Sequence, residues 1–188
     1  MAVRVNVISA IDSDYGIGAK GHLPWSLPKE YQYFQSKILT TKEPTKKNAV
    51  IVGRKTWGDK PASSRPLDQV IHVLLSRSLT ESPSDKVILC RSYGEALEVL
   101  SKPPLSDTIE TVWNIGGSFV YKAGIESDSC HRLYLTRINK KFDGVDTHFP
   151  IVDWSRYREI TENESDVPNG EQEENEIRYK YHVYEKVG

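Results

Sequence analysis

Three stretches of the chain run from apolar, strand-forming residues directly into an arginine beside serine or threonine. They are residues 48–56 (NAVIVGRKT), 70–78 (VIHVLLSRS) and 87–92 (VILCRS). Ligands of open α/β sheets bind beyond the carboxyl ends of the strands, where such residues would gather. If Arg54 and Lys55 open a helix, they oppose its dipole unless an anion offsets them. Several phosphates at this edge would do so, which predicts a large phosphorylated cofactor.

A carboxylate lies on the apolar face of the helix expected over residues 27–39. The apolar stripe on that face, at i, i+4, i+7 and i+11, consists of Leu27, Tyr31, Phe34 and Ile38. Glu30 precedes Phe34 by four residues and so shares the face. A carboxylate there is costly unless a group hydrogen-bonds it. Acids are also favoured in the first helical turn, so spacing alone leaves a functional carboxylate and a solvated one as open alternatives.

Alternating strands and helices would position these residues. Besides the three junctions, the patterns predict strands at residues 3–11, 132–138 and 176–186, the last of them antiparallel. Helices are expected at 27–39, with Pro28 in the first turn, and at 93–102, before Pro103 and Pro104.

Two segments between these elements predict loops. Residues 12–25 contain three glycines and one proline, which favours a mobile loop. Residues 162–176 are acidic and almost free of apolar side chains, which predicts a solvated loop.

Composition narrows the class of protein. The 188 residues predict one domain spanning 1–188. A net charge of −1 argues against a general nucleic-acid or membrane-surface binder, because such partners require a basic field. Two cysteines, Cys90 and Cys130, are too few for a disulfide framework and are typical of a reduced compartment, so we expect a cytoplasmic protein. No histidine spacing predicts a metal site, and a monomer is the simplest expectation.

The order of short motifs resembles that of dihydrofolate reductases of the animal type. The motifs are GIG-x-x-G-x-LPW (16–25), E-Y-x-Y-F-Q (30–35), V-G-R-K-T-W (52–57), R-P-L (65–67), L-S-R (75–77), I-G-G-S-x-V-Y (115–121), Y-L-T-R-I (134–138), D-T-x-F-P (146–150) and K-Y-x-V-Y-E-K (180–186). Each motif alone is weak evidence. Their joint order and spacing extend over nearly the whole chain.

The resemblance implies an α/β fold: a single dihydrofolate-reductase-like domain with an eight-stranded, mostly parallel mixed sheet. Its C-terminal strand is antiparallel, and about four helices flank the sheet. It also implies that Glu30 accepts the paired N–H donors of a dihydropterin, supported by the hydroxyl of Thr136. Trp25 would lie beside the carboxylate and help to hold a water molecule. We take Glu30, Trp25 and Thr136 as the catalytic candidates, although sequence alone fits core packing for Trp25 and Phe34 and strand preference for Thr136.

The small-molecule substrate implied by the family is dihydrofolate. The expected substrate-binding residues are Ile8, Ser9, Leu23, Glu30, Tyr31, Phe34, Gln35, Lys60, Pro61, Ser64, Leu67, Val70, Ile115, Tyr121 and Thr136. Among them, Ile8, Tyr31, Phe34 and Ile115 would form flat apolar walls around the pterin ring.

The implied cofactor is NADPH. In this interpretation the glycines of residues 116–117 let the backbone approach the pyrophosphate, which the N–H groups of the next helix bind. Ser76, Arg77 and Arg91 would recognise the 2′-phosphate, and residues 16–22 would close over the nicotinamide. The expected cofactor-binding residues are Ala10, Ile17, Gly18, Gly21, Gly53, Arg54, Lys55, Thr56, Leu75, Ser76, Arg77, Arg91, Ser92, Ile115, Gly116, Gly117, Ser118, Phe119, Val120, Tyr121 and Thr147.

One departure from the family pattern concerns the glutamate tail of folate. After R-P-L the family places an arginine that binds the tail carboxylate, and this chain has Val70. Truncating such a pair costs about 2–5 kcal/mol. Substitute cations or donors are Lys60, Arg65 and Gln35. Three functions therefore stay open: a dihydrofolate reductase that forms tetrahydrofolate for one-carbon metabolism, a reductase of tailless dihydropterins, and a weakly catalytic binding paralogue.

Overall fold

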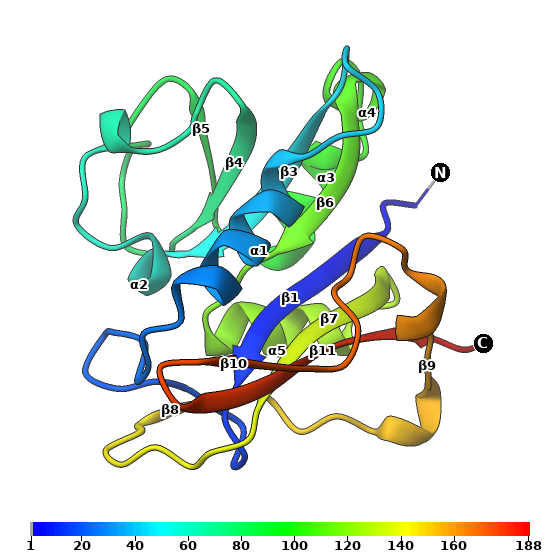
Figure 1. Cartoon of the computed structure of the whole chain (residues 1–188). Coiled ribbons are helices and arrows are strands. Elements are labelled where there is room, and N and C mark those ends of the chain that lie inside the picture. The colour runs from blue at the N-terminus through cyan, green and yellow to red at the C-terminus, as the bar shows by residue number, and fades with distance from the viewer. Residues whose placement is uncertain (1) are drawn as a thin grey trace.

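The computed structural model describes residues 2–188, which are built around one mixed β-sheet (Figure 1). Its strands follow the order β10-β11-β7-β1-β6-β3-β4-β5, and β9 pairs with β11. The strands are β1 (Val5–Ile11), β3 (Lys47–Gly53), β4 (Val70–Leu75), β5 (Val87–Cys90), β6 (Ile109–Asn114), β7 (Cys130–Ile138), β9 (Tyr157–Glu159), β10 (Glu171–Glu174) and β11 (Ile177–Lys186). The predicted fold class is confirmed, with β9 as an addition to the eight strands in path order.

The strands from β7 to β5 are parallel, whereas β11 is antiparallel to both β7 and β10. Within residues 2–188 the α-helices number five, against about four expected. They are α1 (Pro28–Leu39), α2 (Arg54–Trp57), α3 (Tyr93–Leu100), α4 (Leu105–Thr108) and α5 (Ser118–Glu126). No helix in this part of the chain is long and apolar enough to cross a membrane.

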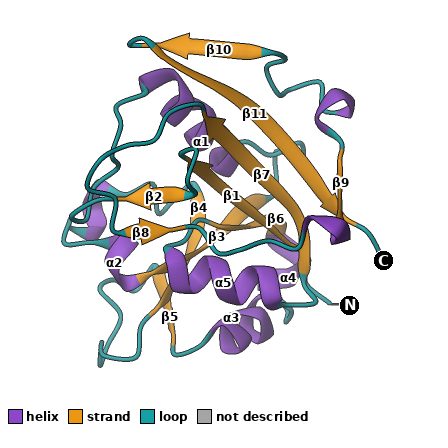
Figure 2. Cartoon of the chain, turned by 90° about the horizontal axis from the view of Figure 1, so that it is seen from below, coloured by secondary structure: helices purple, strands orange, loops and turns teal. Residues whose placement is uncertain are grey.

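Helices cover both faces of the sheet, with α1 on one side and α3 and α5 on the other (Figure 2). Successive side chains of a strand point to opposite faces, and β3 follows this rule. Val50 packs with Ile38 of α1, while Ala49 and Ile51 pack with Ala96 of α3 and with Val120 of α5. Burial on both faces explains why the parallel strands are almost uniformly apolar.

A buried amide attaches α1 to the sheet. Asn48, near the start of β3, donates from Nδ2 to the carbonyl oxygens of Ile38 at 3.1 Å and Thr40 at 2.9 Å. Its Oδ1 accepts from the backbone N–H of Thr111 at 3.2 Å. The last carbonyls of a helix lack partners within the helix. Asn48 satisfies them and thereby fixes the C-terminal end of α1 against β3 and β6.

Both predicted loops contain strands. Gly16–Gly18 (β2) lies in the expected mobile loop and pairs with Thr147–His148 (β8). In the acidic segment, Glu171–Glu174 forms β10, so the expectation of a solvated loop over 162–176 was wrong for these residues. The charges of β10 remain compatible with a strand because it lies at the edge of the sheet, where one side faces solvent.

Candidate active site

The loops that carry the candidate residues meet at the carboxyl ends of the parallel strands. The backbone N–H of Gly53, which ends β3, donates to the carbonyl of Gly116, which follows β6, at 2.8 Å. Ile115 donates in the same way to Ile51 at 3.1 Å. These bonds bring the R-K-T junction and the double glycine side by side, as the sequence predicted for one sheet edge.

Glu30 lies in the first turn of α1 and points towards the sheet. Its side chain is only 6% exposed, and Thr136 of β7 donates to its Oε1 from Oγ1 at 2.9 Å. Burial raises the pKa of Glu30 from 4.5 to about 7, the Thr136 hydrogen bond opposes this shift, and the charge of Glu174 adds to it. The open choice between a buried and a solvated Glu30 is therefore decided for the buried one.

Aromatic and aliphatic side chains surround this carboxyl group. Ile8 and Trp25 are buried in one core cluster, against which Phe34 and Ile115 pack half-buried. The Trp25 ring lies 5.4 Å from that of Phe142. Its Nε1 is buried and has no hydrogen-bond partner within residues 2–188. The site therefore offers one apolar wall and an indole donor that is still available to a polar group.

Two of the expected substrate-binding residues are largely exposed. Tyr31 is 47% and Leu23 54% exposed, and the Tyr31 ring lies 5.9 Å from that of Phe34. Exposed large apolar surface at the rim of a polar site is typical of ligand-binding positions. Ser9 is buried, and its hydroxyl donates to the carbonyl of Ala10 at 3.2 Å.

Tyr121 of α5 connects the ends of two central strands. Its hydroxyl donates to the carbonyls of Ile8 at 2.8 Å and Ile115 at 3.1 Å. A Cβ on Gly116, whose φ is +89°, would lie 2.5 Å from the Tyr121 ring. Gly116 is therefore required both by its backbone conformation and by this close approach.

The start of α5 offers unpaired backbone donors. The first intrahelical bond runs from Tyr121 N–H to the Gly117 carbonyl at 2.8 Å, so the N–H groups of residues 118–120 have no helical acceptor. The Gly117 N-cap makes no side-chain cap. A Cβ on Gly117 would lie 3.0 Å from Oγ1 of Thr56. These groups form a small cradle of backbone N–H donors beside a hydroxyl group, an arrangement suited to an anion.

The basic residues at the end of β3, Arg54 and Lys55, differ in how available their side chains are. Arg54 and Lys55 do open a helix, α2. The Arg54 side chain turns back, donating to the Gly58 carbonyl at 2.9 Å and lying 3.6 Å from Asp59. Lys55 and Thr56 are exposed. The two cations are thus at the sheet edge, but the guanidinium of Arg54 already has protein partners.

The expected 2′-phosphate residues lie together after β4 and β5. Arg91 donates from Nη1 to the carbonyl of Ser76 at 3.1 Å, and also to the carbonyl of Leu79. The Ser76 hydroxyl accepts from the N–H of Leu79 at 3.1 Å. Ser92 caps α3 by accepting from Glu95 N–H. Arg77 is exposed and follows Leu75, the last residue of β4, so it is the arginine most available to an added anion.

The glycine-rich loop rests on β8. A Cβ on Gly18 would lie 3.4 Å from Cβ of Thr147, and half-buried Ile17 packs on a core cluster. Gly21 has a φ of +79°, with open space around it. Gly18 and Thr147 are thus in contact and Ile17 is next to them in the chain, whereas Ala10 packs on a different core cluster and Gly21 lies at the exposed tip.

In the expected tail region, Val70 stands where the family places an arginine. Val70 is fully buried in the core that includes Ile8 and Trp25. It therefore presents no surface to a substrate, contrary to our expectation for this position. Arg65 stacks on the Trp57 ring at 3.7 Å and donates to the carbonyls of Trp57 at 2.5 Å and Lys60 at 2.9 Å.

The remaining tail candidates lie at the surface. Gln35, Lys60, Pro61 and Ser64 are exposed and Leu67 is half-buried. The Ser64 hydroxyl donates to the Pro61 carbonyl at 2.7 Å. Lys60 is therefore the exposed cation in this set, and Arg65 is occupied by its own loop.

Sequence reasoning missed Asp12, which fixes the start of the glycine-rich loop. Asp12 is buried, and its Oδ1 accepts from the N–H groups of Gly16 at 2.6 Å and Asp14 at 2.9 Å, while Oδ2 accepts from Phe142 at 3.2 Å. An aspartate directly before a turn is a known signal for such bonds. Only the contact to Phe142, far away in the sequence, could not be foreseen.

The comparisons with known proteins agree with this geometry. The family model described as dihydrofolate reductase matches residues 4–186. The dihydrofolate reductase of Drosophila melanogaster is 42% identical over 185 residues and that of Sus scrofa 43% over 183, which is 98% and 97% of each chain in the pair. The solved structure of Schistosoma mansoni dihydrofolate reductase superimposes with a TM-score of 0.83 at 31% identity, covering both chains fully.

The raised pKa of Glu30 predicts a pH-dependent gain in stability for Glu30→Gln. The folded state of the parent binds the Glu30 proton more tightly than the unfolded state does. The resulting contribution to the free energy of unfolding is complete below pH 4.5 and is lost as pH rises to about 7. A shift of that size corresponds to roughly 3 kcal/mol. Glu30→Gln should therefore gain up to about that much free energy of unfolding relative to the parent between pH 5 and pH 8, measured by urea titration.

The matched control for this measurement is Glu173→Gln, which changes an exposed glutamate of β10. Its free energy of unfolding should stay within about 0.5 kcal/mol of the parent at both pH values. If the free energy of unfolding of Glu30→Gln does not exceed that of the parent at pH 8, burial of the Glu30 carboxylate does not destabilise the folded state.

Proposed function

Because the chain belongs to the dihydrofolate reductase family, we propose that it reduces 7,8-dihydrofolate to 5,6,7,8-tetrahydrofolate with NADPH. The observation that supports this most strongly is the buried carboxyl group of Glu30, bound by Thr136 beside an apolar wall. An ionisable group with a strongly shifted pKa in such surroundings is typical of a functional site.

Recognition of the substrate would depend on Glu30. The pterin head presents two parallel N–H donors, and one carboxylate can accept both in charge-assisted hydrogen bonds. Thr136 restricts the rotation of the carboxyl group. Phe34 and Ile115 would contact the faces of the flat ring, and the exposed side chains of Tyr31 and Leu23 would close over it. The head would thus be oriented before any reaction.

The reaction needs a hydride at C6 and a proton at N5 of the substrate. When bound, the reduced nicotinamide supplies the hydride. In the free protein Glu30 is about half protonated near pH 7. When the carboxyl group ionises to accept the two pterin N–H donors, the proton it gives up would pass to N5 through water at the Trp25 indole. Exclusion of bulk water strengthens the electrostatic support for the protonated imine. Above pH 7 the carboxyl group loses this proton, and the rate of the chemical step is expected to fall.

The residues at the sheet edge fit the implied cofactor. The unpaired N–H groups of residues 118–120 and the cradle at Gly117 and Thr56 suit a pyrophosphate. Exposed Arg77 suits the 2′-phosphate that distinguishes NADPH from NADH. Residues 16–22, anchored by Asp12 and resting on Thr147, would cover the nicotinamide.

A second candidate function is the reduction of dihydropterins that lack a glutamate tail. It is favoured by the complete burial of Val70 and by the protein contacts of the Arg65 guanidinium. Neither residue offers a cation to a tail carboxylate. Both functions would use the same pterin site and the same cofactor.

We also propose that the chain acts in the cytoplasm as a monomer built of one domain, with no role for nucleic acid, membrane or metal. The two cysteines, Cys90 and Cys130, are buried and unpaired, which is compatible with a reducing compartment. Within residues 2–188, His, Cys, Asp and Glu side chains form no group of three that could hold a metal ion.

Replacing Glu30 by Gln tests the proposed function. Glutamine keeps the size of the side chain but provides neither a charge nor a labile proton, so kcat/KM for dihydrofolate should fall by roughly 100-fold or more. The Kd of NADPH, measured by fluorescence quenching, should change less than about twofold. Glu173→Gln should behave as the parent. A Glu30→Gln enzyme with the activity of the parent would remove the central role of this residue.

Replacing Arg77 by Ala tests the choice of cofactor. Loss of a charge-assisted contact with the 2′-phosphate should raise KM for NADPH by roughly tenfold to 100-fold. KM for NADH, which lacks this phosphate, should stay within about twofold. Lys102→Ala is the control, because this exposed lysine follows α3 away from the strand ends. An equal loss with both cofactors would contradict the assignment of Arg77.

A comparison of substrates separates the two candidate functions. A tail-binding arginine contributes about 2–5 kcal/mol, equivalent to roughly 30-fold to 5000-fold in kcat/KM. Without one, kcat/KM for dihydrofolate and for a tailless dihydropterin should agree within about tenfold. If dihydrofolate is preferred far more strongly, another cation binds the tail, and Lys60→Ala should then reduce activity with dihydrofolate alone.

A further inference from the structure

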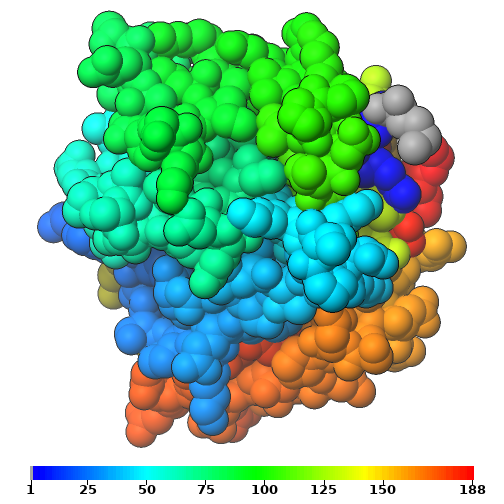
Figure 3. All heavy atoms as spheres, turned by 90° about the horizontal axis from the view of Figure 1, so that it is seen from above, coloured from blue at the N-terminus to red at the C-terminus, as the bar shows by residue number. Residues whose placement is uncertain are grey.

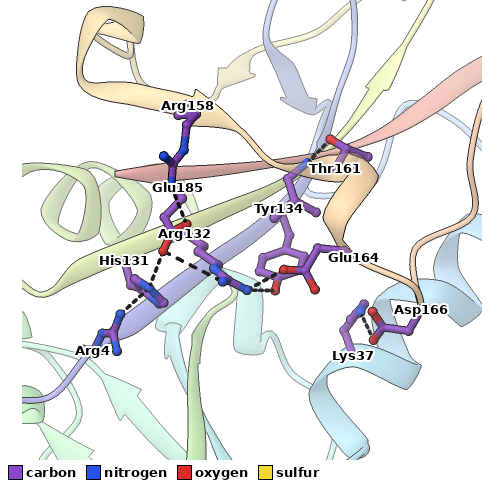
Figure 4. Close-up of polar contacts among 11 residues, drawn as sticks. Arg4, Lys37, His131, Arg132, Tyr134, Arg158, Thr161, Glu164, Asp166 and Glu185 are labelled. Atoms are coloured by element: carbon purple, nitrogen blue, oxygen red, sulfur yellow. Dashed lines mark hydrogen bonds and ion pairs between the residues drawn. The ribbon is translucent and has the colours of Figure 1, made fainter. Parts of the chain in front are cut away.

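The acidic segment that precedes β11 lies along the helix that carries Glu30. In Figure 3 this segment, in orange, borders α1, in blue, over the length of the helix. Near the C-terminal end of α1, Lys37 forms an ion pair with Asp166 at 2.5 Å, and Arg132 of β7 binds Glu164 at 2.6 Å (Figure 4). Val167, which follows Asp166, is buried in the same core as Ile38. The segment is therefore attached to α1 and to the sheet.

At the other end, Glu174 occupies the N-terminus of α1. The helix has no side-chain cap of its own, since its N-cap is Leu27. Glu174, the last residue of β10, accepts from the N–H of Lys29 at 2.7 Å through Oε1 and from that of Glu30 at 3.2 Å through Oε2. The first N–H groups of a helix lack internal acceptors and favour a negative charge. A residue 144 positions away thus provides the missing cap.

The hairpin between β10 and β11 holds Glu174 in this position. The hydroxyl of Tyr179 donates to its Oε2 at 2.6 Å. Asn175, in the turn, donates from Nδ2 to the carbonyl of Ser26 at 3.0 Å. Both Asn175 and Glu176 have positive φ angles, 49° and 63°, as a tight two-residue turn requires. The capping carboxylate is therefore fixed by a neighbour on β11 and by a second contact to the chain before α1.

Glu174 is also the carboxylate whose charge acts on Glu30. The groups that face Glu30 are Thr136 of β7, Tyr33 of α1, Tyr121 of α5, Tyr181 of β11 and Glu174. Burial raises the pKa of each of these tyrosines, so they stay neutral. Burial opposes ionisation of Glu174 as well, but hydrogen bonds from Tyr179 and from the backbone of Lys29 and Glu30, together with the Lys29 charge, lower its pKa. Glu174 thus remains negative near neutral pH.

We propose that Glu174 is a positioning residue of the reductase, which fixes the first turn of α1 and the Glu30 carboxyl group and keeps a negative charge beside it. This inference rests on the proposed function, because Glu174 acts on the reaction only through Glu30. Its two effects are separable. The hydrogen bonds to the first turn orient Glu30, whereas the charge favours the protonated form of Glu30.

The test compares Glu174→Gln and Glu174→Asp with Glu173→Gln, which alters the exposed neighbour on β10. For each variant, kcat and KM for dihydrofolate are measured between pH 5 and pH 9. Glu174→Gln should move the midpoint at which the rate falls to lower pH by roughly half a unit. It should also raise KM by roughly threefold to tenfold, since the cap is weakened.

The other two variants separate charge from capping. Glu174→Asp keeps the charge on a shorter side chain, so its KM should rise while the pH midpoint stays near that of the parent. Glu173→Gln should match the parent in both quantities. A purely structural role would lower activity in Glu174→Gln without moving the midpoint, and that result would overturn the inference.

Two further outcomes are decisive in different ways. If the parent reduces dihydrofolate and Glu174→Gln keeps both its pH midpoint and its KM, the positioning role is wrong and the proposed function stands. If the parent shows no NADPH-dependent reduction of any dihydropterin, the proposed function fails and this inference fails with it.

Discussion

The arrangement of this protein depends on one carboxyl group held out of water. Glu30 is buried between α1 and the sheet, with a single side-chain donor, Thr136, on one oxygen. Burying an ionisable group with so few partners is unfavourable, and the raised pKa expresses that cost. Natural proteins retain such groups where a ligand offsets the unfavourable burial, because a pair of donors on the ligand supplies the missing hydrogen bonds. The surrounding structure is best understood as the support for this group.

Several distant parts of the chain provide that support. Asn48 fixes the C-terminal end of α1 to β3 and β6, and Glu174 closes its N-terminal end. The facing strand, β7, contributes Thr136. The parallel strands bring the two phosphate-binding candidates together through the bond between Gly53 and Gly116. Head group and cofactor would therefore meet at one edge because the strands that carry their contacts end there.

Much of this could be predicted from the sequence. The strands, α1 with its apolar stripe, the helix after the double glycine and the pairing of Glu30 with Thr136 follow from local patterns and from the family resemblance. The other contacts between remote segments could not be foreseen, because no local pattern encodes them. Glu171–Glu174 has the composition of a loop, yet it forms an edge strand and caps α1. Arg54, Arg65 and Arg91 are suited to anions by type, but each donates to backbone carbonyls, Arg54 and Arg65 within their own loops and Arg91 to the segment after β4. Val70 is the first residue of β4 and is buried in the core that includes Ile8 and Trp25.

The most direct measurement of the central claim is the ionisation of Glu30 itself, followed by carbon-13 NMR of labelled glutamate side chains or by difference infrared spectroscopy. In the free protein one carboxyl group, absent from Glu30→Gln, should be half protonated near pH 7. Addition of a pterin should convert it to the ionised form at that pH, because two N–H donors stabilise the carboxylate. A Glu30 that titrates near pH 4.5, or that keeps its pKa when a pterin binds, would contradict the account.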